Sequence, residues 1–197
     1  QKKQIVEILE NYMAGVENKR LEIGKETEYE ELSLDTQVEH TRAYIKIQDG
    51  CNQFCSYCII PYARGRIRSR KQEDVIAEVV RLAESGYQEV VLTGIHISSY
   101  GIDFQDEPWQ QGHSIEALKE EGRHDYRGQS KLVDLVEQIH EIEGLRRIRL
   151  GSLEPRIVTP QNAARLSAMK KVCPHFHLSL QSGCDETLKR MNRHYTA

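Results

Sequence analysis

The hydrophobic positions of the chain switch repeatedly between the period of a strand and the period of a helix. Apolar and polar residues alternate over residues 43–47, which predicts a short strand. Apolar positions at helical spacing follow from 75 to 83, a glycine at position 86 ends that pattern, and residues 89–93 form an apolar run. These features predict one strand–helix–strand unit.

The same alternation continues toward the carboxyl end. A helical pattern from 132 to a closing glycine at 144 precedes a predicted strand at 147–150. Thr159-Pro160 supplies a helix cap followed by a proline at the first helical position, and residues 175–180 read as a further strand. We therefore expect an α/β fold with four parallel strands, helices on the sheet, and functional loops at the carboxyl ends of the strands. An open doubly wound sheet fits this alternation as well as part of a barrel does.

Three other stretches suggest how the chain is organised. Residues 1–15 contain an amphipathic helical face and are expected to end a preceding domain, and the acidic residues 16–40 read as a linker. The main domain then covers residues 41–197, interrupted by a long polar insertion at 101–130. Because the first residue is Gln and the last residues close no element, we expect a piece of a longer protein.

Composition narrows the class of protein. A chain of 197 residues with 39% hydrophobic content can build one substantial core. It has neither a run of about 20 apolar residues nor a signal-peptide core, so we expect a soluble, cytoplasmic protein without membrane contact. The net charge of −3 gives no general signature of nucleic-acid binding. Any such binding would need a local patch, and the basic run Arg64, Arg66, Arg68, Arg70 and Lys71 is the candidate. A solvated loop paired with Glu73 and Asp74 explains the run equally well.

The cysteines carry the strongest chemical signal. Cys51, Cys55 and Cys58 lie within eight of the 197 residues, whereas Cys173 and Cys184 stand apart and are expected to be small buried residues. Thiolates suit iron–sulfur clusters or zinc, and three of them on one loop would leave one iron of a cluster open. A structural zinc site usually needs four ligands, and no histidine follows at zinc-finger spacing. Zinc and a reactive thiol remain the alternatives.

The segment from Gln48 to Gly65, with the sequence QDGCNQFCSYCIIPYARG, resembles the radical S-adenosylmethionine (SAM) methylthiotransferase family. The resemblance implies part of a (β/α) barrel with four of about six parallel strands present. It implies a 4Fe-4S cluster on Cys51, Cys55 and Cys58 whose open iron binds exchangeable SAM, and a second 4Fe-4S cluster in an absent amino-terminal domain. Tyr57 would lie against the adenine of SAM, or would simply pack the loop.

Three further segments, at 93–101, 151–156 and 177–183, resemble the branch of this family that acts on threonylcarbamoyladenosine in tRNA. The branch acting on isopentenyladenosine usually has Gln-Asn in place of Ile95-His96, and the branch acting on a ribosomal-protein aspartate has Gln-Asp there. The resemblance further implies SAM contacts by strand-end residues, any of which could equally be a turn residue: Thr93, Gly94, Ser152, Glu154 and Gln181.

The implied reaction transfers a methylthio group to carbon 2 of the modified adenine next to the anticodon. The partners implied are tRNA, with phosphate contacts from Arg64, Arg66, Arg68 and Arg70, and an electron donor such as flavodoxin or ferredoxin. The cofactors carry the difficult chemistry, so no side chain is assigned as a general acid or base. The sequence does not fix the oligomeric state. The alternatives are another radical SAM methylthiotransferase, acting on isopentenyladenosine in tRNA or on a ribosomal protein, a different radical SAM reaction, and a non-enzymatic metal-binding RNA module.

Overall fold

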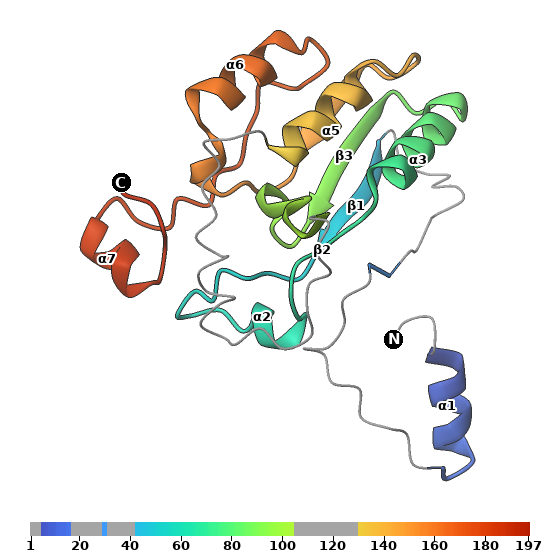
Figure 1. The fold of residues 1–197 in the computed structure, drawn as a ribbon. Coiled ribbons are helices and arrows are strands. Elements are labelled where there is room, and N and C mark those ends of the chain that lie inside the picture. The colour runs from blue at the N-terminus through green and yellow to red at the C-terminus, as the bar shows by residue number, and fades with distance from the viewer. Residues whose placement is uncertain (1–4, 17–28, 31–41, 105–129) are drawn as a thin grey trace.

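The computed structural model describes residues 5–16, 29–30, 42–104 and 130–197. A sheet with strand order β2-β1-β3-β4 organises this part of the chain (Figure 1). The central strands β1 (Ala43–Asp49), β3 (Glu89–Gly94) and β4 (Arg147–Leu150) run parallel. The short β2 (Arg68–Ser69) pairs antiparallel with β1. The carboxyl ends of the three parallel strands therefore meet at one edge of the sheet.

Helices cover this sheet and complete one hydrophobic core. The helix α3 (Gln72–Glu84) contacts β1 and α5 (Lys131–His140), and α5 also contacts α6 (Pro160–Ala168). The side chains of Ser130 and Thr159 accept hydrogen bonds from the first turns of α5 and α6, which fixes where these helices begin. Fully buried aliphatic residues from strands and helices fill the space between them: Ile45, Ile47, Val75, Val79, Leu92, Leu135, Val136, Ile139 and Ile148.

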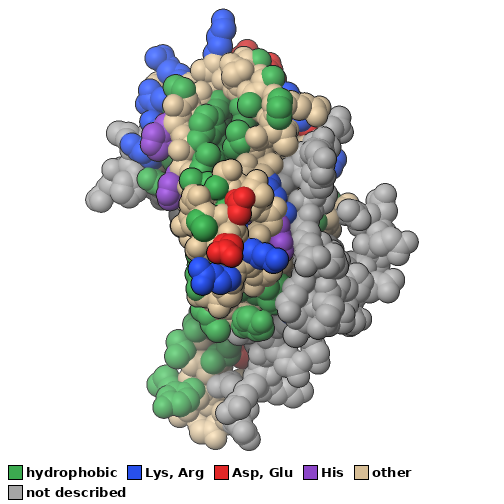
Figure 2. Space-filling model, turned by 90° about the vertical axis from the view of Figure 1, so that its left-hand side faces the viewer, with side chains coloured by type: hydrophobic (Ala, Val, Ile, Leu, Met, Phe, Trp, Pro, Cys, Tyr) green, Lys and Arg blue, Asp and Glu red, His purple; other side chains and the backbone are tan. Residues whose placement is uncertain are grey.

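Shorter elements complete the described part. They are α1 (Ile5–Met13), α2 (Ile60–Ala63), α7 (Asp185–Arg190) and three 3₁₀ turns at Ile97–Ser99, Ile102–Phe104 and Pro155–Ile157. Figure 2 looks onto the face that carries α7, where acidic and basic side chains gather below a group of exposed hydrophobic ones. No described helix has the length and apolar character needed to cross a bilayer.

The structure confirms the α/β class and the three predicted helices after residue 70, but it corrects one strand. Residues 175–180 do not form a fourth parallel strand, because only isolated bridges join Ile148 to Val172 and Leu153 to Leu178. The backbone N–H groups of His175, Leu180 and Ser182 bond instead to the carbonyl two residues earlier. These tight turns use the donors of His175 and Leu180. Pairing of this segment is therefore limited to the bridge at Leu178, where the Ser179 amide and the His177 carbonyl bond to Leu153. The fourth strand of the sheet is β2, which belongs to the basic run.

The predicted domain limits at 15 and 40 stay predictions. Most of the predicted linker and residues 105–129 of the predicted insertion lie outside the described residues.

Candidate functional site

The cysteine loop leaves the sheet directly at the carboxyl end of β1. Gly50 makes this exit possible, because its φ of +70° is left-handed and a Cβ there would lie 1.7 Å from the carbonyl oxygen of Arg66. The amide of Cys51 then donates to the carbonyl of Gly65 at 3.1 Å. The loop is thus closed at its base by backbone contacts for which only glycine leaves room.

The three thiols of the loop share one environment. Cys51 and Cys55 are buried and Cys58 is half-buried. Burial raises the pKa of the Cys51 thiol to about 12, and its neighbours Cys55 and Cys58 push that pKa further in the same direction. Two N–H donors point at these sulfurs: the Gln53 amide lies 3.4 Å from Cys51 Sγ, and Arg193 Nη1 lies 3.1 Å from Cys55 Sγ. Such donors stabilise thiolate ligands of a bound metal centre.

A single metal ion is the alternative to a cluster at this place. Among the described residues, no three His, Cys, Asp or Glu side chains are grouped as ligands of one ion. The predicted zinc alternative stays a prediction.

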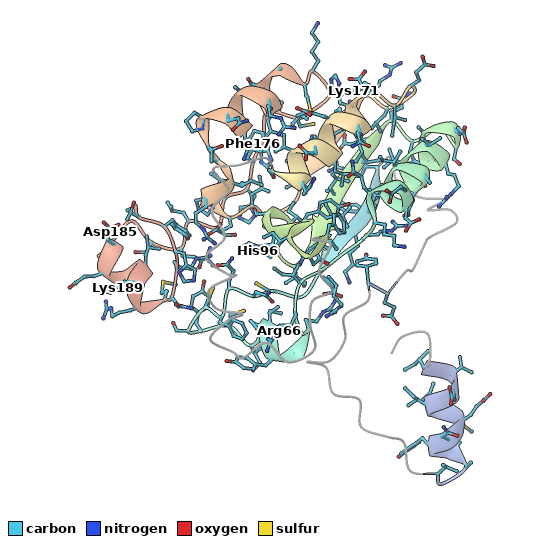
Figure 3. The ribbon with its side chains drawn as sticks, in the orientation of Figure 1. Arg66, His96, Lys171, Phe176, Asp185 and Lys189 are labelled. Carbon is cyan, nitrogen blue, oxygen red and sulfur yellow. The ribbon has the colours of Figure 1, made fainter. Side chains whose placement is uncertain are left out.

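Hydrogen bonds tie the cysteine loop to the ends of β3 and β4. The buried Gln48 donates through Nε2 to the carbonyls of Asp49 and Gly50 at 2.7 Å each, and its Oε1 accepts from the His96 amide at 2.7 Å. Ser98 Oγ accepts from the Glu154 amide at 2.9 Å. Figure 3 shows His96 at the edge of the sheet that faces the loop carrying Arg66. The carboxyl edge is therefore one connected unit.

Several buried polar atoms at this edge have no partner. Within the described residues these include Glu154 Oε2, His96 Nε2 and Asn52 Nδ2. Burial raises the pKa of Glu154, although Arg156 donates to its other oxygen at 2.7 Å. Burial lowers the pKa of His96 to about 3, and the positive charges of Arg156 and Arg193 act in the same direction. Leaving buried polar atoms unpaired costs about 1–3 kcal/mol each, so these atoms are available to a polar ligand or to water.

The structure brings some of the predicted cofactor-binding residues to this edge. Glu154 is 2% exposed and faces the loop through Arg156, whose Nη2 donates to Gln53 at 3.1 Å. At Gly94 a Cβ would lie 2.8 Å from the Gln48 carbonyl oxygen, so glycine permits β3 to approach β1 closely. Thr93 Oγ1 donates to the Ile45 carbonyl at 3.3 Å. Part of the role of Thr93 and Gly94 is therefore structural.

The remaining predicted cofactor contacts are more exposed. Ser152 pairs with His177 at 2.8 Å, and Gln181 adopts a left-handed φ of +66° on the surface. Tyr57 is 54% exposed beside Cys55. The expectation that Cys184 is buried is wrong, because this residue is exposed at the start of α7. Cofactor contact by Ser152, Gln181 and Tyr57 stays a prediction.

The basic run has intramolecular partners. Arg64 donates to Asp49 at 2.9 Å, and the Arg66 guanidinium lies 4.8 Å from the centre of the Phe54 ring. Arg68 and Arg70 are only 9% and 5% exposed, and Arg70 pairs with Glu78. These partners differ from the predicted Glu73 and Asp74. Phosphate binding stays a prediction for all four arginines, and the more exposed Arg64 and Arg66 have more surface available for it.

The comparisons with known proteins agree with the geometry of the cysteine loop. Residues 45–197 match the family model described as the radical SAM superfamily. This chain belongs to the radical SAM superfamily. A solved radical SAM methyltransferase, TsrM from Kitasatospora setae, shares the fold with a TM-score of 0.50 at 19% identity, over 78% of this chain and 26% of that one.

Curated relatives of this radical SAM chain carry two kinds of name. Threonylcarbamoyladenosine tRNA methylthiotransferase MtaB is 37% identical over 87% of the chain in Chlamydia pneumoniae and 39% over 92% in Bacillus subtilis (strain 168). The tRNA-2-methylthio-N(6)-dimethylallyladenosine synthase of Clostridium beijerinckii is 39% identical over 92% of the chain. The chain covers 35% of each of these three proteins, so it spans about a third of their length.

The superfamily implies a 4Fe-4S cluster and SAM, and the residues present fit both. Cys51, Cys55 and Cys58 supply three neighbouring thiols, with N–H donors directed at two of them. The unpartnered atoms of Glu154 and His96 lie at the same carboxyl edge. Sequence reasoning gave no role to Gln48, Arg156, Asn192 and Arg193, because their contacts join distant segments. Gln48 and Arg156 lie within the motif segments, whereas no local pattern marks Asn192 and Arg193.

Proposed function

We propose that this chain is the radical-generating part of an enzyme that transfers a methylthio group to carbon 2 of N6-threonylcarbamoyladenosine in tRNA, next to the anticodon. One observation carries the proposal. The three-cysteine loop lies at the same sheet edge as the buried, unpartnered atoms of Glu154 and His96. Thiolates for a cluster and free polar atoms for a polar ligand are thereby placed together.

Different residues of the chain have different roles in the proposed site. Cys51, Cys55 and Cys58 would hold a 4Fe-4S cluster, which would leave one iron without a protein ligand and available to SAM. When bound, the cluster and SAM supply a 5′-deoxyadenosyl radical after transfer of one electron from a donor such as flavodoxin or ferredoxin. Burial of Cys51 and Cys55 limits the contact of bulk water with these two sulfurs. Glu154 offers its free oxygen to the ribose or amino group of SAM, with Thr93 and Gly94 beside it.

The net reaction needs more than this chain. At carbon 2 of the adenine, the C–H bond would be replaced by a C–S bond. The hydrogen atom would leave in 5′-deoxyadenosine, and the SAM that is cleaved would also give methionine. The sulfur would come from a second 4Fe-4S cluster outside this chain, which would take up the remaining electron, and a second SAM would supply the methyl group and leave as S-adenosylhomocysteine. An enzyme of this kind works on tRNA in the cytoplasm. The relatives' greater length leaves room for the additional cluster and for RNA-binding parts.

Sequence identity alone does not choose the substrate, since relatives of both names match at 36–40%. The threonylcarbamoyl group is polar and carries a carboxylate, whereas the dimethylallyl group is apolar. Arg156 and Arg193 place positive charge near His96, and the neutral His96 offers a free ring nitrogen. Ile95-His96 and Leu153-Glu154-Pro155 also match the threonylcarbamoyl branch in the resemblance described above.

Product analysis on defined tRNAs tests this proposal. The full-length protein, reconstituted anaerobically with iron and sulfide, would be given SAM, a reductant and tRNA carrying either threonylcarbamoyladenosine or isopentenyladenosine. We expect a mass increase of one methylthio group on the first nucleoside only, with 5′-deoxyadenosine formed in step. Cys58→Ala should abolish both products. Modification of the isopentenyl nucleoside alone would overturn the substrate assignment, and 5′-deoxyadenosine formation without either tRNA product would indicate another radical SAM reaction.

A further inference from the structure

A turn after α7 packs directly on the cysteine loop, although more than 130 residues separate the two in sequence. The Ser56 amide donates to the carbonyl of Met191 at 3.2 Å. Asn192 Nδ2 donates to two successive carbonyls of the loop, those of Gln53 at 3.1 Å and Phe54 at 3.0 Å. These bonds join the loop on both sides of Cys55 to the turn after α7.

The backbone at both ends of this contact is unusual. Phe54 has a φ of +48° and Asn192 a φ of +57°, both in the left-handed region. Asparagine tolerates that region well, but a bulky residue such as phenylalanine does so only where its surroundings enforce it. The two hydrogen bonds from Asn192 are such an enforcement, and Phe54 also packs edge-on against Tyr62 at 5.6 Å between ring centres.

Arg193 extends the same contact to a sulfur atom. Its Nη1 donates to Cys55 Sγ at 3.1 Å, while Nε donates to the Tyr195 hydroxyl at 3.1 Å and Nη2 to the Ser179 carbonyl at 3.4 Å. The Tyr195 hydroxyl is itself anchored on the Ser179 carbonyl at 2.8 Å. The guanidinium is therefore held in place from two other directions while it faces the sulfur.

We propose that Asn192 and Arg193 clamp the cysteine loop, and that Arg193 raises the reduction potential of the bound cluster through its hydrogen bond to the Cys55 sulfur. Reduction adds one negative charge to the cluster, and an N–H donor with a positive charge beside a ligand sulfur stabilises that charge. Asn192 is the positioning residue, since it fixes the loop in the conformation that brings Cys55 to Arg193. The inference rests on the cluster of the proposed function but not on its substrate.

Redox titration of the reconstituted full-length protein, followed by electron paramagnetic resonance without SAM, tests the role of Arg193. Arg193→Gln should shift the midpoint potential of this cluster to a more negative value. Arg193→Lys, which keeps the charge and a donor, should lie between that variant and the parent. The matched control is Arg190→Gln, because Arg190 is an exposed arginine of the same segment and its removal changes the net charge equally. We expect the potential of the control to equal that of the parent.

Asn192→Gly separates the clamp from backbone strain, because glycine keeps the left-handed conformation but lacks the amide. It should lose iron to a chelator several times faster than the parent. An unchanged potential in Arg193→Gln with full iron content would overturn the role of Arg193, as would loss of iron in both Arg193 variants with the fold intact. A parent protein that binds no cluster would instead overturn the proposed function itself.

Discussion

Two buried glutamates at opposite ends of the sheet show how differently its two edges are built. Glu89 begins β3 and is 4% exposed, and Glu154 follows β4 and is 2% exposed. Glu89 accepts from Arg147 at 2.5 Å and from Arg149 at 2.7 Å, with Arg42 at 3.5 Å. Glu154 has one arginine on one oxygen, and its other oxygen has no partner within the part of the chain that the structure describes.

The pKa values of the two carboxyl groups are shifted in opposite directions. Burial acts to raise both, but the arginine hydrogen bonds outweigh it at Glu89 and its pKa is lowered. At Glu154 burial prevails and the pKa is raised. At the amino edge the buried charge of Glu89 is paired with arginines, and these contacts stabilise the fold. At the carboxyl edge one buried oxygen of Glu154 has no partner among the described residues. In parallel α/β folds the carboxyl edge is where ligands bind.

The largest expected effect comes from breaking the carboxyl edge at its backbone. Gly50→Ala would place a Cβ 1.7 Å from the Arg66 carbonyl oxygen, and we expect a loss of at least about 3 kcal/mol in unfolding free energy together with loss of the cluster. Gly86→Ala is the matched control, since Gly86 is also left-handed but has open space around it. It should cost about 1–2 kcal/mol and retain the cluster. Urea unfolding and iron analysis measure both, and equal effects would contradict the account.

Removing the buried charge of Glu89 at the amino edge should have the next largest effect on the unfolding free energy. Glu89→Gln leaves three arginines without their carboxylate, and we expect a loss of about 2 kcal/mol at neutral pH, because the arginines reach solvent and lose less than fully buried ions would. The lowered pKa of Glu89 means that its contribution is present above its ordinary value of 4.5 and disappears as the pH falls below that value. The difference between parent and variant in urea unfolding should therefore shrink in acid. A constant difference would argue against the ion-pair explanation.

The equivalent change at the carboxyl edge should affect ligand binding more than stability. Glu154→Gln removes a carboxyl group with a raised pKa, whose stabilising contribution is present at low pH and is lost as the pH rises through the folded-state pKa. The variant should gain stability relative to the parent between pH 4 and pH 8, with the two within about 1 kcal/mol at neutral pH. We expect SAM to bind roughly tenfold more weakly, because one good hydrogen bond to a charged group is lost. Unchanged SAM affinity by equilibrium dialysis would remove Glu154 from the cofactor site.

The smallest effect should come from the outermost arginine of the amino edge. Arg42 is 43% exposed in its side chain and lies 3.5 Å from Glu89. Arg42→Gln should change the unfolding free energy by less than about 0.5 kcal/mol, as for other exposed ion pairs. A loss as large as that of Glu89→Gln would show that the three arginines act as one unit.

The parts of the fold that local sequence decides were predictable. Helical spacing and a cap such as Thr159 located α3, α5 and α6. Apolar–polar alternation located β1, an apolar run located β3, and the short segment after the glycine at 144 located β4. The strand prediction for residues 175–180 was wrong. Apolar alternation alone does not show that the backbone donors of His175 and Leu180 are used in local turns.

The candidate site was predictable only in its local part. Three cysteines within eight residues identified the loop. The contacts of Gln48, Arg156, Asn192 and Arg193 join segments that only folding brings together, and the basic run gave no sign that Arg70 turns inward to Glu78.

Anaerobic reconstitution of the full-length protein, compared with a variant in which Cys51, Cys55 and Cys58 are all alanine, tests the central claim most directly. Iron and sulfide would be counted, and the electron paramagnetic resonance spectrum of the reduced protein recorded with and without SAM. The account predicts that the variant lacks about four irons, and that SAM changes the spectrum of the parent but not that of the variant. Equal iron content in both proteins, or a parent spectrum indifferent to SAM, would contradict it.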